Sequence, residues 1–225
     1  MMTILLQITQ PIIEAETPES MTWFQLLAKG GVIMYPILLL SIAALYVFIE
    51  RLLYLRKAAI YKKEFITNIR STLQSGDIGA AKSFARMEHS ATGAIILSGL
   101  NSIGKPTRDI ESTLESATNI QVAEMENHTG YLGIIAGVAP MLGFIGTISG
   151  IIQIFYNISL SDNISIGIIA GGLYEKMITS GSGLVVGVLA YVAYHLLHMK
   201  IHRFTLQIQK DVFDFLQSIT NPAKN

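Results

Sequence analysis

The sequence predicts an all-α integral membrane protein, with three transmembrane helices that continue into long cytoplasmic helical extensions. Two observations predict this class. Of the 225 residues, 51% are hydrophobic and only 14% are charged, which is richer in apolar and poorer in charged side chains than an average soluble domain. The chain also contains long runs without any Asp, Glu, Lys or Arg, and about 20 apolar residues suffice for a helix to cross a bilayer.

The same composition argues against other classes of protein. The formal net charge is zero and no basic cluster is interleaved with aromatic residues, so nucleic acid is not expected as a partner. The absence of cysteine excludes disulfides and thiolate chemistry. The sequence shows no nucleophile with its base, no phosphate-binding loop and no paired catalytic carboxylates, so we predict no enzyme activity, no cofactor and no metal site.

The first element is a short tail, residues 1–29. Its apolar start is broken by polar residues and Pro11 and lacks the basic region of a signal peptide, so we interpret it as lying outside the membrane. A charge-free run follows from Gly30 to Ile49. It predicts the first transmembrane helix over residues 30–55.

Two further spans follow in the second half of the chain. The longest charge-free run has 35 residues, and within it we place the second transmembrane helix over 130–156. Glycine and proline are tolerated in such helices. A loop over 157–165 leads to the third transmembrane helix, expected over 166–197 and interrupted only by Glu175 and Lys176.

The distribution of lysine and arginine predicts the orientation. Both residues are frequent after the first and third spans, whereas the N-terminal tail is acidic. By the positive-inside rule, the N-terminal tail and the 157–165 loop lie on the periplasmic side, and residues 56–129 and 198–225 are cytoplasmic.

Both cytoplasmic segments are expected to be helical. Turn signals at 75–77, 89–93 and 104–106 divide the first one, and we expect residues 108–156 to form one uninterrupted rod into the membrane. The apolar residues of the last segment recur at helical spacing: Ile201, Phe204, Ile208, Phe215 and Ile219. The third span therefore also continues as a helix, and such apolar stripes favour a bundle of identical subunits.

The second and third spans each have one small, weakly polar face. On a helical projection the second span groups Gly143, Gly146, Thr147 and Gly150 opposite bulky side chains. The small face of the third span consists of Gly172, Glu175, Thr179, Ser182, Gly183 and Ala190. We expect the bulky faces to meet lipid and the small faces to contact another helix or to line a space.

Helix packing alone explains much of this pattern. Three G-x-x-x-G spacings support close contact between helices. The residues assigned to packing are Gly133, Gly137, Pro140, Gly143, Gly146, Gly150, Gly183 and Gly187. The hydroxyls of Thr147, Thr179, Ser180 and Ser182 can line a path for ions, or can bond back to the carbonyl one turn earlier.

Glu175 is the strongest functional candidate. A carboxylate within the bilayer costs roughly 2.5 kcal/mol or more, so it indicates function by default. The alternative is an interfacial pair of Glu175 with Lys176, because the 23 uncharged residues from Met177 to Met199 could cross alone.

Three histidines share a face at the cytoplasmic end of the third span: His195, His198 and His202. No carboxylate joins them, so we interpret them as titratable groups at a helix end near the headgroups rather than as metal ligands.

The stretches APMLGFIGTISGI (139–151) and GGLYEKMITSGSGLVVGVLAY (171–191) resemble the proton-channel family of ExbB, TolQ and MotA. The three-span plan fits ExbB and TolQ better than MotA, whose members have four spans. In the motif of that family, Thr147 matches the threonine of span two and Glu175 the glutamate of span three. Ser180 occupies a position that is usually threonine, so the neighbouring Thr179 is an alternative hydroxyl.

The resemblance implies a ring-shaped homo-oligomer, a pentamer, in the bacterial inner membrane. Its second and third spans would surround the helix of an ExbD- or TolR-like single-span partner, which carries a proton-binding aspartate. Proton flow would drive a TonB- or TolA-type transducer, with Thr147, Glu175, Thr179, Ser180 and Ser182 along the proton pathway. A non-conducting membrane scaffold is the alternative, and the choice between protons and sodium stays open.

Overall fold

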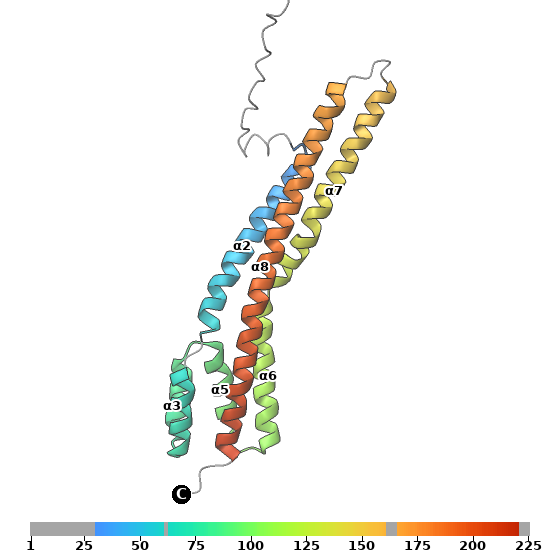
Figure 1. The fold of residues 1–225 in the computed structure, drawn as a ribbon. Helices are drawn as coiled ribbons and strands as arrows, with labels where there is room; N and C mark the ends of the chain where they lie inside the picture. The colour runs from blue at the N-terminus through green and yellow to red at the C-terminus, as the bar shows by residue number, and fades with distance from the viewer. Residues whose placement is uncertain (1–29, 61–62, 161–165, 221–225) are drawn as a thin grey trace, which may run out of the picture.

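The computed structural model describes residues 30–60, 63–160 and 166–220. Within these ranges the regular elements are seven α-helices, α2 to α8, so the predicted all-α class is confirmed (Figure 1). The tail 1–29 and most of the predicted loop 157–165 lie outside the described residues.

Three long helices form one half of the molecule. They are α2 (Met34–Ala58), α7 (Thr129–Leu160) and the first part of α8 (Ile166–Thr220). In Figure 1, α7 runs beside α8, and α2 packs against this pair from one side. Each helix is long and apolar enough to cross a membrane, which agrees with the three predicted spans.

Four shorter helices surround the lower part of α8. They are α3 (Lys63–Gln74), α4 (Ile78–Met87), α5 (Ala91–Asn101) and α6 (Thr107–Glu126). The predicted turn signals fall between them, and two act as helix caps. The carboxylate of Asp77 accepts from the amide of Ala80 at 2.8 Å, and the Ser90 hydroxyl accepts from the amide of Gly93 at 3.3 Å.

The two halves are packed with different residues. Large apolar side chains are fully buried in and next to the lower half: Ile69, Ile95, Ile96, Leu100, Leu114, Met125, Leu132, Leu197, Ile201 and Ile208. In the upper half most large side chains point outward instead, as Phe144 and Leu189 do with 63% and 65% exposure, although Met34 and Ile37 of α2 are buried. Small residues fill the contact between α7 and α8 there.

The expected single rod over residues 108–156 is wrong. α6 ends at Glu126 and α7 begins at Thr129, with His128 between them in a left-handed backbone conformation, at a φ of 64°. The Thr129 hydroxyl donates to the carbonyl of Glu126 at 2.6 Å across the break. Neither Gly nor Pro stands between the two helices, so the strongest sequence signals for a break are missing.

A buried arginine from α2 supports this break. Arg51 is only 6% exposed, and its Nη1 donates to the carbonyl of Glu124 at 3.3 Å. That carbonyl belongs to the last turn of α6, where carbonyls lack helical partners. The guanidinium also pairs with Glu50 and lies 4.9 Å from the ring centre of Tyr54, while Nδ1 of His128 is 4.0 Å from Glu50. The end of α2 is thereby tied to the junction of α6 and α7.

α8 is one continuous helix of 55 residues, about 80 Å long at 1.5 Å per residue. Its lower part buries Ile201, Phe204, Ile208 and Phe215 in the core. The predicted continuation of the third span as a helix is confirmed. The cytoplasmic location of this part stays a prediction.

Candidate functional site

The contact between α7 and α8, here called the seam, runs along one stripe of α7. The buried residues of this stripe recur every three or four positions: Leu132, Ile135, Ala139, Gly143, Gly146, Gly150 and Ile154. This is the spacing of one helix face. From Ala139 to Gly150 every buried residue of α7 is Ala or Gly, so the two backbones can approach closely.

Glycines bring the two backbones into contact at the centre of the seam. A Cβ on Gly143 would stand 3.0 Å from both Cα and the carbonyl oxygen of Ser180. A Cβ on Gly183 would stand 2.5 Å from the carbonyl oxygen of Ala139 and 3.1 Å from Cα of Gly143. Larger side chains at Gly143 or Gly183 would therefore push α7 and α8 apart.

Pro140 lies in the same seam, inside α7. Proline removes the hydrogen bond that would otherwise reach the carbonyl of residue 136. A Cβ on Gly187 of α8 would collide with the Pro140 ring and would stand 3.0 Å from the Ala136 carbonyl oxygen. Gly187 thus gives room to both the ring and the carbonyl that the ring leaves without its helical donor.

Further along the seam, Gly150 makes room for a lysine. A Cβ on Gly150 would collide with the methylene chain of Lys176. The ammonium of Lys176 pairs with Glu175 at 2.8 Å, with side-chain exposures of 22% and 39%. Because the two opposite charges neutralise each other, the pair lowers the cost of placing either in an apolar setting.

The start of α2 covers one side of the seam. The Thr179 hydroxyl donates to the carbonyl of Gly30 at 2.6 Å, and Thr179 is 1% exposed. A Cβ on Gly146 would stand 3.0 Å from Cγ2 of Thr179 and 3.5 Å from Cδ1 of Ile33. Gly31 has a φ of +70°, and a Cβ there would stand 2.8 Å from Oε1 of Glu175. We call this side, against α2, the covered side.

Thr147 and Ser180 lie on the other side of the seam, which we call the open side. Thr147 follows Gly146 by one residue, so its side chain is turned by about 100° away from α2. Ser180 follows Thr179 in the same way. Gly143, one turn before Thr147, contacts the backbone of Ser180, so both hydroxyl residues border the seam from the open side. Both are half-buried in the single chain.

The predicted pathway residues are therefore divided between the two sides. Thr179 and Glu175 lie on the covered side, and Ser182, three residues after Thr179, projects in the same direction. Thr147 and Ser180 lie on the open side. The Thr147 hydroxyl donates to the Gly143 carbonyl at 3.0 Å, the bond to the previous turn that the sequence allowed as an alternative.

Two predicted packing residues lie further down α7. A Cβ on Gly133 would stand 3.5 Å from the ring of Tyr194, which is ordinary van der Waals contact. Gly137 has no neighbour within 4 Å of such a Cβ, so no contact within the described chain requires glycine there.

Sequence reasoning missed the part that α2 takes in the site. In the sequence Gly30 and Gly31 only begin an apolar run, yet they supply the carbonyl for Thr179 and the turn beside Glu175. The Gly-Gly pair that precedes a long apolar helix was the available signal for a tight turn. Lys176 gave no comparable signal that its methylene chain lies over Gly150.

Comparison with known proteins places both helices of the seam in one family. The model of the MotA/TolQ/ExbB proton channel family matches residues 87–210. A putative biopolymer transport protein ExbB-like 1 of Synechocystis is 27% identical over 190 residues, covering 83% of this chain and 74% of its own length. A putative biopolymer transport protein ExbB homolog of Methanothermobacter thermautotrophicus is 29% identical over 176 residues, which cover 77% and 62%. The Tol-Pal system protein TolQ of Haemophilus influenzae is 27% identical over 118 residues, which cover 51% and 50%.

Proposed function

The chain belongs to the MotA/TolQ/ExbB proton channel family, and from this premise we propose that it is the proton-channel and stator subunit of an inner-membrane motor. The subunit forms a ring, taken to be a pentamer, around an ExbD- or TolR-like single-span partner. Proton flow through this assembly energises a TonB- or TolA-type transducer for outer-membrane transport or envelope maintenance. The N-terminus lies in the periplasm and the C-terminus in the cytoplasm.

One observation carries this proposal: the open side of the seam carries the hydroxyls of Thr147 and Ser180, and α7, the helix of Thr147, has no carboxylate and no basic side chain. α7 contains no Asp, Glu, Lys or Arg from Thr129 to Leu160. It cannot by itself pass a proton along its length. Because α2 occupies the opposite side, the open side is the one that remains for the partner helix, with Thr147 and Ser180 facing it.

The chemistry follows from the cost of charge in an apolar place. A partner carboxylate beside Thr147 and Ser180 can accept hydrogen bonds from their hydroxyls while it is ionised, with the Thr147 hydroxyl turning from the Gly143 carbonyl to the carboxylate. Protonation removes most of the cost of moving this carboxylate past apolar side chains. The membrane potential supplies about 2.3 kcal/mol per charge per 100 mV. Several protons per stroke can therefore perform mechanical work on the partner.

We propose that the residues of the covered side, Glu175, Thr179 and Ser182, belong to the outer part of the proton pathway. The pair of Glu175 with Lys176 has no net charge, but the dipole between its two charged groups can attract or repel an ion that passes close to it. Thr179 and Ser182 support it, since Thr179 ties α8 to the start of α2 through the carbonyl of Gly30. In this proposal Glu175 acts on the ion through its field, and Thr147 and Ser180 contact the partner.

The test is substitution of Thr147→Val and of Glu175→Ala in cells that depend on this chain. We expect both variants to lose most of the potential-dependent uptake or envelope integrity. Thr205→Val is the matched control, because the Thr205 hydroxyl makes the same kind of bond to the previous turn, to Ile201 at 3.0 Å, away from the seam. Full activity of both Thr147→Val and Glu175→Ala would refute the site.

A non-conducting scaffold is the second candidate. It is favoured by the internal bonds of the site, since the Thr147 hydroxyl bonds within α7 and Glu175 is paired with its neighbour. A scaffold would assemble normally without any acid-bearing single-span protein. Purification of the assembled chain from native membranes distinguishes the two, because only the channel requires such a partner to be present.

A further inference from the structure

Two tyrosines and two histidines form a ring cluster lower on α8. The ring centres of Tyr191 and His195 are 4.3 Å apart, and those of Tyr194 and His198 are 4.5 Å apart. Tyr194 also lies 5.2 Å from His195, so it connects both pairs. We call these four residues the ring cluster. Its members are half-buried or exposed, and none is in the core.

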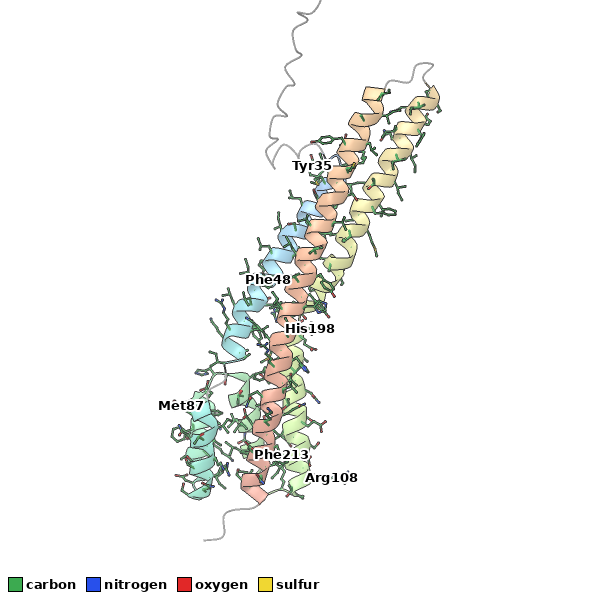
Figure 2. The ribbon with its side chains drawn as sticks, viewed as in Figure 1. Tyr35, Phe48, Met87, Arg108, His198 and Phe213 are labelled. Atoms are coloured by element: carbon green, nitrogen blue, oxygen red, sulfur yellow. The ribbon has the colours of Figure 1, made fainter. Side chains whose placement is uncertain are left out.

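The ring cluster continues the open side of the seam downward. Tyr191, Tyr194 and His198 follow Ser180 by 11, 14 and 18 residues, which is close to three, four and five turns of an α-helix. α8 is continuous over this range, so these residues share a stripe with Ser180. The ring of Tyr194 lies against Gly133, so this part of the stripe borders α7. Figure 2 shows His198 at the edge of α8 turned away from α2.

At the same level, the side of α8 that faces α2 is apolar. A groove of about 450 Å³ lies there between the two helices. Its lining residues include Phe48 from α2, and Leu189, Val192 and Leu196 from α8. None of the residues that line this groove is titratable, and Ser41 is the one hydroxyl-bearing residue among them, whereas the ring cluster on α8 has four titratable side chains.

We propose that His195 and His198 are proton-accepting residues at the cytoplasmic end of the path, held in place by Tyr191 and Tyr194. This rests on the proposed function, in which the partner carboxylate meets Ser180. From Ser180 to His195 is 15 residues, or about 22 Å along the helix, most of the thickness of the bilayer core. A proton released from the partner needs an acceptor at this depth, and imidazole is the side chain that exchanges protons near neutral pH.

The transfer is a simple exchange. A neutral imidazole takes the proton on one ring nitrogen and gives the proton of its other nitrogen to water on the cytoplasmic side. His202, one turn below His198 and exposed, is the next group toward the cytoplasm. Other titratable groups of the neighbouring elements include Glu50, Arg51 and Tyr54 at the end of α2, Glu124 and Glu126 at the end of α6, His128 and Tyr131 on the α7 side, and Lys200 and Arg203 on α8 itself.

A metal site is the obvious competing use of clustered histidines. Among the described residues no three His, Cys, Asp or Glu side chains are grouped so that they could hold a metal ion. The histidines of the ring cluster pack edge-on against tyrosine rings instead, which restrains the orientation of both imidazole rings.

The experiment measures proton flux through the full chain, reconstituted in vesicles with the single-span protein that copurifies with it. In the double variant His195→Gln/His198→Gln we expect flux to fall by about 10²-fold, the lower end of what a positioned proton-transfer group contributes. Imidazole buffer added on the cytoplasmic side should restore most of the flux, because a free imidazole can replace the missing acceptor. A merely structural role would not respond to the buffer.

His89→Gln is the matched control, since His89 lies beside α4 and α5, away from the stripe, and should conduct normally. Unchanged flux in the double variant, or a loss that imidazole does not restore, would overturn the inference. If the wild-type assembly carries no proton flux at all, the proposed function fails instead, and the two failures are thus separate.

Discussion

At the scale of single residues, the seam shows why glycine is used at some positions and not at others. Gly183 and Gly143 stand where a Cβ would meet the backbone of the opposite helix, whereas Gly137 has no neighbour within 4 Å. All three look alike in the sequence, as members of G-x-x-x-G spacings or of a small face. The distance to the neighbouring helix separates them.

We therefore predict that adding one methyl group, by replacing glycine with alanine, affects stability differently at Gly183 and at Gly137. Gly183→Ala should lower the stability of the purified protein in detergent by about 1–3 kcal/mol, because its Cβ would stand 2.5 Å from the Ala139 carbonyl oxygen. Gly137→Ala, the matched control, should leave stability unchanged or raise it by roughly 0.5–1 kcal/mol, since alanine favours the helix. Thermal unfolding followed by circular dichroism measures both, and equal losses would contradict this account of the seam.

At the scale of elements, the junction of α6 and α7 changes the expected long rod into two helices. The change depends on His128, whose backbone is left-handed at a φ of 64°. A residue with a Cβ is strained in this conformation, and glycine is not. Arg51 of α2 holds the end of α6 through the Glu124 carbonyl, so the direction of the membrane helix is set partly by α2.

We therefore predict that His128→Gly stabilises the protein by up to about 1 kcal/mol and that His128→Val destabilises it. His128→Asn separates backbone from side chain, because asparagine tolerates the left-handed region but lacks the imidazole that lies 4.0 Å from Glu50. The melting temperatures of the three variants measure these differences in stability. A lower melting temperature for His128→Gly than for His128→Asn would show that more than backbone strain is involved.

At the scale of the whole molecule, two packing schemes are joined by α8. The lower half buries large apolar residues as soluble helical bundles do, while the centre of the α7–α8 contact in the upper half buries glycine and alanine, and most large side chains there point outward. This inversion suits a lipid environment, where apolar outer surfaces carry no cost and close backbone contact supplies the attraction between helices. The open side, carrying small residues and hydroxyls, is the exception on the outer surface of the pair.

The position of the partner helix can be tested by disulfide cross-linking. The chain contains no cysteine of its own, so each introduced cysteine is the one reactive thiol of the chain. A single Thr147→Cys should form a disulfide with a cysteine introduced in the partner helix one turn from its acid. Ile152→Cys is the control: the Ile152 side chain is 63% exposed on the bulky face of α7, and it should react with lipid-soluble reagents only. Cross-linking at Ile152 but not at Thr147 would place the partner on the wrong face and exclude the proposed arrangement.

Much of the fold could be predicted from the sequence by itself, because the bilayer imposes simple rules on a chain. Charge-free runs of sufficient length predict the spans, and the small faces of the second and third spans predict contact with another helix or a space, without specifying which helix. The resemblance to the family rests on the same stretches. The Thr147 bond within α7 is likewise one of two alternatives that local sequence allows.

What the tertiary structure alone decided is which helix covers which side. The sequence placed Glu175, Thr179 and Ser182 with Gly183 on one small face, since helical periodicity groups residues by angle and takes no account of neighbours. α2 docks on that side through Gly30, which buries Thr179 and leaves Thr147 and Ser180 as the open hydroxyls. The docking depends on contacts between residues 149 positions apart, and no local pattern specifies them.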